Sequence, residues 1–221
     1  GNFTSRGFFN EEAARKFAAE LRDRGMDVYV GGAPAYSTLG WFNDPLLNTF
    51  IHFPETSLAE LIFHELAHHH LFIKDDATFN ESFATAVAQI GVARWLETKR
   101  GAEQRDEYLS RCARRHTLSE LLATSRSQLK KLYGSIKTDK EQREGKKELV
   151  AALKKDLVTL SQIDPDYRKL ELWAQHPINN AVLGARSVYH RRVPAFYALY
   201  EQSGRDIGAF LCETEKIARE L

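Results

Sequence analysis

From Ser57 to the C-terminus, apolar residues recur at the three- and four-residue spacing of an α-helix, and this pattern restricts the fold of the 221-residue chain more than any other feature. It is clearest in the segment 101–160, where leucines form a stripe along two long stretches. We expect two helices here, broken near Gly134 to Thr138, that form a charged hairpin. The segment has 14 basic and 9 acidic residues. Because acids are interspersed throughout, we interpret this surface as a solvated helical face.

Short capping signals predict where the other helices begin and end. Asn10 followed by two glutamates predicts a helix start, and Gly25 predicts its end. Ser57 with a glutamate three residues later fits a capping box, so we expect a helix from there to about Ile73. A further helix is expected over residues 78–100, ended by a glycine. Three or four shorter helices should follow after residue 165.

The N-terminal part contains three segments with the character of β-strands, each closed by a proline or a turn signal. They are Asp27–Val30, Tyr36–Phe42 and Asn48–Phe53. We therefore expect a small N-terminal sheet beside one helix. The predicted fold class is α+β and predominantly helical.

Composition excludes several classes of protein. Lys and Arg number 31 against 30 Asp and Glu, so the chain lacks the basic excess of a dedicated nucleic-acid binder. No apolar run approaches the roughly 18 residues that cross a bilayer, so we expect the given chain to be soluble. Two cysteines, far apart, make no disulfide framework. The unusual feature is histidine, because four of the eight lie between His64 and His70.

The sequence His64-Glu65-Leu66-Ala67-His68 is an H-E-x-x-H motif within a predicted helix. Its two histidines are four residues apart and project from one face, one turn from each other. This arrangement suits two imidazole ligands of one tetrahedral Zn²⁺ ion, and Glu65 beside them can accept a proton from water. We expect the apolar flanks, Leu61, Ile62, Leu66 and Leu71, to form the buried side of this helix. His69 and His70 point elsewhere and are expected at the surface.

A catalytic zinc site needs a third protein ligand and an open position. The best candidate is Glu81, thirteen residues after His68, where a helix–turn–helix can fold back across the metal. Thr78 and Glu81 also fit a capping box, which would occupy the carboxylate. The helix could equally start at Asp76 and leave Glu81 free. Thr85, one turn further, is a candidate to orient a histidine ligand.

These motifs resemble those of the gluzincin metallopeptidases. H-E-L-A-H (64–68) followed by F-N-E-S-F-A (79–84) is similar to their zinc-binding segments. A closer resemblance is to a bacterial family of predicted aminopeptidases. It covers nearly the whole chain, and its longest blocks are the segments 27–49, 58–68 and 79–85.

The resemblance implies a zinc peptidase in which His64, His68 and Glu81 are ligands and Glu65 is the general base. It implies zincin-like active-site helices in a catalytic part, residues 1–100, and a helical part, residues 101–221, packed with it as one catalytic unit. Members of the family often begin with a lipoprotein-type signal. We therefore expect that the full-length protein has a further N-terminal segment that anchors it in the bacterial cell envelope, on the periplasmic side.

The predicted mechanism uses metal-activated water, with Glu65 accepting its proton during attack on a peptide carbonyl. The resulting oxyanion needs a further donor, for which Tyr189 is the candidate. The peptide substrate could pair by strand addition with the expected strand, at Thr38, Leu39 and Gly40. Characterised gluzincin aminopeptidases hold the substrate amine with a glutamate in a G-x-M-E-N loop. This sequence has no such loop, so we can name no residue that would make the site selective for a free N-terminus.

Three alternatives stay open. The first is a zinc endopeptidase. The second is a non-catalytic zinc-binding envelope protein that docks a partner through the hairpin at residues 101–160. The third is a helical domain in which the metal only joins two helices. A structural zinc usually has a fourth Cys or His ligand, and Cys112 is the one cysteine remotely available for this role.

Overall fold

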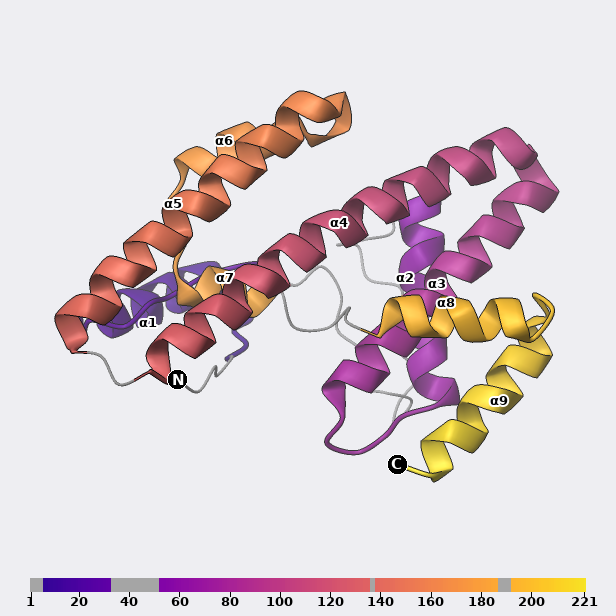
Figure 1. Ribbon diagram of the computed structural model, residues 1–221. Coiled ribbons are helices and arrows are strands. Elements are labelled where there is room, and N and C mark those ends of the chain that lie inside the picture. Colours follow the sequence, from indigo (N-terminus) through magenta and orange to yellow (C-terminus); the bar gives the residue numbers. More distant parts are fainter. Residues whose placement is uncertain (1–5, 33–51, 136–137, 187–191) are drawn as a thin grey trace. The chain divides into compact units, whose positions relative to one another are not determined.

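The computed structural model describes residues 6–32, 52–135, 138–186 and 192–221, and in these ranges the chain is predominantly helical, as predicted. Figure 1 shows the helices in chain order. They are α1 (Glu11–Asp23), α2 (Glu55–His70), α3 (Ala77–Arg100), α4 (Ala102–Tyr133), α5 (Asp139–Ile163), the short 3₁₀ helix η1 (Pro165–Tyr167), α6 (Lys169–Gln175), α7 (Asn180–Arg186), α8 (Val193–Gln202) and α9 (Ile207–Arg219). Within the described ranges, no helix is both long and apolar enough to cross a membrane.

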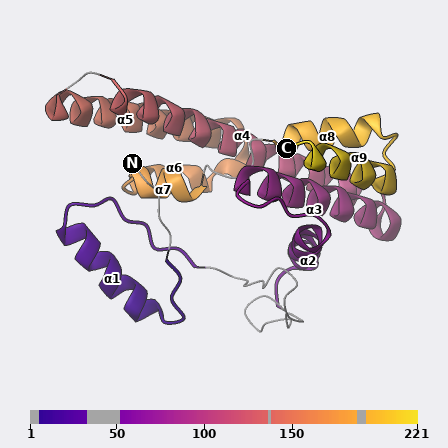
Figure 2. The same ribbon diagram turned by 90° about the horizontal axis from the view of Figure 1, so that it is seen from below.

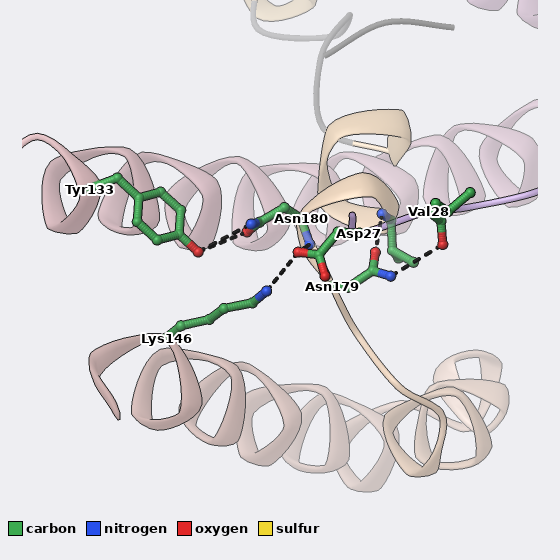
Figure 3. Close-up of polar contacts among 7 residues, drawn as sticks. Asp27, Val28, Tyr133, Lys146, Asn179 and Asn180 are labelled. Atoms are coloured by element: carbon green, nitrogen blue, oxygen red, sulfur yellow. Dashed lines mark hydrogen bonds and ion pairs between the residues drawn. The ribbon is translucent and has the colours of Figure 1, made fainter. Parts of the chain in front are cut away.

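The predicted N-terminal sheet is not supported, because none of the described residues forms a β-strand. The segment Asp27–Val30 belongs to no strand. Its hydrogen bonds involve side chains and do not form the backbone ladder of a sheet. Asn179 donates from Nδ2 to the Val28 carbonyl (3.2 Å), and Asp27 accepts from Lys146 Nζ (2.6 Å) and from the Asn180 backbone N–H (3.1 Å), as Figure 3 shows. The expected strand at Tyr36–Phe42 lies outside the described residues. Of the third, only His52 and Phe53 are described, in a turn and a bend.

Two compact units divide the chain, and each is built from separate stretches of sequence. Unit 1 comprises residues 1–31 and 118–188, and unit 2 comprises residues 32–117 and 189–221. These units are defined by backbone contacts, so the expected functional division at residue 100 stays a prediction.

The predicted hairpin is present as two long helices, α4 and α5, of which α5 and the part of α4 from Leu118 onward belong to unit 1. Four leucines of the predicted stripe lie in the buried core of the unit, namely Leu122, Leu129, Leu153 and Leu157. Ile178 and Leu183 belong to the same core. Near the turn the helices approach closely at Gly145, where an added Cβ would lie 2.9 Å from Leu132 Cδ1. The second helix begins with a capping box in which Thr138 and Glu141 exchange hydrogen bonds.

In unit 2, α3 is the central helix and is buried along most of its length. The connection 71–76 leads back to α2, so that α3 packs against it, and Figure 2 shows α2 in end view beside α3. On its other side lie α8 and α9. Four phenylalanine rings, Phe79, Phe83, Phe196 and Phe210, join these helices in one core. The helix with the N-E segment therefore contributes two rings to an aromatic core, to which α2 adds Ala67.

Most of the predicted helix ends are confirmed. Asn10 accepts a hydrogen bond from the Ala13 N–H at the start of α1, and Gly101 ends α3 with a φ of +92°, a conformation that favours glycine. The predicted cap at Ser57 is wrong. The helix begins two residues earlier, after Pro54, whose φ of −50° already suits a helix start.

Candidate metal centre

The two histidines of the H-E-x-x-H motif face each other across one turn of α2. His64 Nε2 and His68 Nε2 are 3.1 Å apart, and the ring centroids are 4.7 Å apart. Helical spacing alone produces this pairing, because residues i and i+4 lie on one face. His68 is nearly covered, with 6% of its side chain exposed, whereas His64 is 23% exposed.

Glu81 on α3 completes the group. Its Oε2 lies 3.3 Å from His64 Nε2, and its Oε1 lies 3.6 Å from His68 Nε2. The capping alternative for this residue does not apply, because Asp76 is the N-cap of α3 and accepts from the Phe79 N–H (2.9 Å). The carboxylate of Glu81 therefore faces the histidines, as the second of the two predicted helix starts requires.

The spacing of these donor atoms fits a small cation. One ligand atom from each of the three residues can be chosen so that all lie within 4.8 Å of one another. A tetrahedral zinc with bonds of 2.0–2.1 Å has ligands about 3.3 Å apart. The two histidine nitrogens are 3.1 Å apart and Glu81 Oε2 lies 3.3 Å from His64 Nε2, whereas the 3.6 Å to His68 Nε2 is measured from the other carboxylate oxygen, Oε1. Glu81 is 35% exposed, so one side of the group is open to solvent. Two imidazoles and one carboxylate are one of the ligand sets found in catalytic zinc sites.

Burial favours the neutral form of His68, which is the form that binds metals. Desolvation is the largest cause that lowers the pKa of His68 below its usual 6.5, and the neighbouring His64 lowers it further. Glu81 and Glu65 act in the opposite direction and raise it by a smaller amount. The balance favours an imidazole whose ring nitrogen is free to coordinate at neutral pH.

This lowered pKa predicts how the stability of the metal-free protein depends on pH. Below pH 6.5 the unfolded chain binds a proton at His68 that the folded chain does not bind, so the free energy of unfolding falls as the pH falls. Urea unfolding of metal-free protein between about pH 5 and pH 7.5 measures this slope. A His68→Gln variant should show a shallower slope over the same range. Equal slopes in the two proteins would contradict the prediction.

Glu65, the predicted general base, lies on α2 directly after His64 and is half-buried. Its charge acts on His68, since it is one of the causes that raise the pKa of that histidine. The other predicted site residues, Tyr189, Thr38, Leu39 and Gly40, lie outside the described residues.

Two expectations about the surroundings of the motif need correction. Leu66 is 55% exposed and Ile62 is 36% exposed, so they do not form the buried side of α2. The covered residues are Ala67 and His68, which face α3. Thr85 is buried, yet His68 Nδ1 has no hydrogen-bond partner among the described residues, so the expected bond from Thr85 is not formed at that atom. The prediction for His69 and His70 is confirmed, because both are exposed.

Cys112, the one cysteine that could have closed a structural zinc site, lies elsewhere in unit 2. It is buried beside Tyr108, its Sγ is 3.1 Å from Arg115 Nη2, and it does not belong to the histidine–glutamate group. Burial raises the pKa of the thiol, so it stays protonated at neutral pH. This argues against the alternative in which a four-ligand zinc only joins helices.

Sequence reasoning missed several polar residues that surround Glu81. Asn80 is buried and makes two hydrogen bonds to Ile73, and Ser82 is buried and accepts from the Arg192 backbone N–H. Arg192 also pairs with Asp76 (2.8 Å). The only available signal was the presence of polar residues on both sides of Glu81 in a mostly apolar helix.

The sequence model of one protein family, described as Putative aminopeptidase, matches residues 1–220. The chain belongs to this family. No curated protein and no solved structure matches the chain in the corresponding comparisons. The family match covers both units, including the segments on which the resemblance was based.

Proposed function

We propose that this chain is a zinc-dependent peptidase of the gluzincin type that acts as an aminopeptidase on peptides. The observation that best supports the proposal is the grouping of His64, His68 and Glu81, with their donor atoms within 4.8 Å and one side exposed. The family description supports peptidase activity. The two histidines and the glutamate would hold the ion.

When bound, zinc would polarise a peptide carbonyl and lower the pKa of water at the site. The residues of the chain supply the remaining chemistry. Glu65, beside the ligands on the same helix, accepts the proton of the attacking water and then passes it to the leaving amine. Glu65 is half-buried, so its side chain has access to solvent, and its charge acts on His68.

Tyr189 is proposed to donate a hydrogen bond to the oxyanion. The proposal is supported by the position of Arg192, three residues later in the sequence, whose backbone N–H donates to Ser82 beside Glu81 (3.2 Å). Strand addition of substrate at Thr38, Leu39 and Gly40 remains the proposed way of orienting the scissile bond. The anchoring of the full-length protein in the cell envelope also remains a proposal.

Matched peptides with a free or an acetylated N-terminus test the proposed function. The zinc-loaded protein should cleave the free peptides, chelation should remove the activity, and added zinc should restore it. Cleavage of free but not acetylated peptides supports an aminopeptidase, whereas internal cleavage of both indicates an endopeptidase. If the zinc-loaded protein cleaves no peptide of either set, the peptidase proposal is wrong and a non-catalytic zinc protein is favoured.

A further inference from the structure

Glu81 is flanked in sequence by two buried polar side chains, and each contacts a different part of unit 2. Asn80 is 2% exposed and Ser82 is fully buried. In a helix, neighbours in sequence project about 100° apart. The two side chains therefore leave α3 on either side of the direction in which Glu81 faces the histidines.

Asn80 ties α3 to the connection that follows α2. Its Nδ2 donates to the Ile73 carbonyl (2.7 Å), and its Oδ1 accepts from the Ile73 N–H (2.8 Å). Two bonds to one residue fix both the distance and the rotation between the segments. Their effect is concentrated close to the site, because Ile73 follows His68 by only five residues.

Ser82 ties the opposite side of α3 to the start of α8. Its Oγ accepts from the Arg192 backbone N–H (3.2 Å), while the Arg192 guanidinium pairs with Asp76, the N-cap of α3 (2.8 Å). The first two turns of α3 are therefore bonded to α8 as well as to the connection after α2.

Such bonding matters because metal ligands tolerate little displacement. The carboxylate of a helical glutamate lies roughly 6 Å from the helix axis, given a Cα radius of 2.3 Å and an extended side chain. A rotation of α3 by about 20° would move it by about 2 Å, ten times the tolerance of about 0.2 Å for metal–ligand distances. The hydrophobic effect is non-directional, so directional hydrogen bonds add a constraint on the rotation of α3 that burial alone does not supply.

We propose that Asn80 and Ser82 are positioning residues that fix the rotation of α3, so that the Glu81 carboxylate meets the two histidines at metal-binding distance. The inference rests on the proposed function, because it takes Glu81 as a zinc ligand. Neither residue touches the proposed metal position. Their role is to hold the ligand before the ion arrives.

The test is the zinc affinity of folded variants, measured by competition with a chromophoric chelator. Asn80→Leu removes both bonds to Ile73 at similar volume, and Ser82→Ala removes the acceptor for Arg192. The matched control is Gln89→Met, on the same helix and equally buried, which removes a bond from Tyr197 Oη (3.1 Å) away from Glu81. We expect a 10–100-fold loss of affinity in Asn80→Leu, a smaller loss in Ser82→Ala, and less than about a twofold change in the control.

Two further measurements separate the possible failures. Circular dichroism shows whether each variant is folded, and if Asn80→Leu is not, Ser82→Ala and the visible spectrum of its Co²⁺ form decide the question. Affinities in Asn80→Leu and Ser82→Ala that match wild type or the control would overturn the positioning role. If Glu81→Ala itself leaves zinc affinity unchanged, Glu81 is not a ligand and the proposed metal centre fails together with this inference. If only Glu81→Ala weakens binding, the metal centre stands and the inference is wrong.

Discussion

Replacement of Glu65 by glutamine should lower the rate of peptide hydrolysis by about 10²–10⁴-fold, because general-base catalysis contributes a factor of this size. Glutamine has nearly the same shape but accepts no proton from water. Glu65 does not belong to the donor group formed by His64, His68 and Glu81, so zinc affinity should change little. Steady-state cleavage of a free peptide by zinc-loaded protein measures the effect, with zinc content determined on the same sample.

Glu55→Gln is a suitable control, because it changes a glutamate on the same helix. Glu55 lies at the first residue of α2, is largely exposed and pairs with Arg100. Surface ion pairs of this kind contribute little, so this variant should keep wild-type activity. Full activity in zinc-loaded Glu65→Gln would exclude Glu65 as the general base.

The second large effect is expected for His68→Ala, which should reduce zinc affinity by more than the 10–100-fold that is typical when only an outer partner of a ligand is lost. The chain contains its own control in the next residue. His69 is exposed and points about 100° away from His68 around the helix axis, so His69→Ala should bind zinc like wild type. Isothermal titration of metal-free proteins with zinc compares the two, and equal affinities would contradict the assignment of His68 as a ligand.

Local signals in the sequence were sufficient to predict much of this structure. Asn10 and Gly101 act within one turn of their own helices, and the H-E-x-x-H spacing brings two imidazoles together through helical geometry alone. Glu81 could be predicted because a short connection between two helices leaves few ways to fold back. The leucine stripe of the hairpin is a repeated local pattern and was found for the same reason.

The remaining features depend on partners distant in sequence. Asn179 donates a hydrogen bond to the Val28 carbonyl across 151 positions of sequence. The segment around Val28 has the composition of a strand, but it contacts side chains instead of another strand. Ser82 meets Arg192 across 110 positions. Periodicity also shows that a helix has an apolar face without showing what covers it, which is why the exposure of Leu66 was not foreseen.

The division of each unit into separate stretches has a consequence for how the protein acquires its site. Between the helices that bear His64, His68 and Glu81 and the last pair of helices in unit 2 lies the second stretch of unit 1, residues 118–188. Phe196 and Phe210, which complete the aromatic core around α3, are synthesised after it. Contacts between residues so distant along the chain form slowly, because a long loop must close first. A nascent chain on the ribosome therefore cannot finish the core behind His64, His68 and Glu81 until Phe210 has emerged.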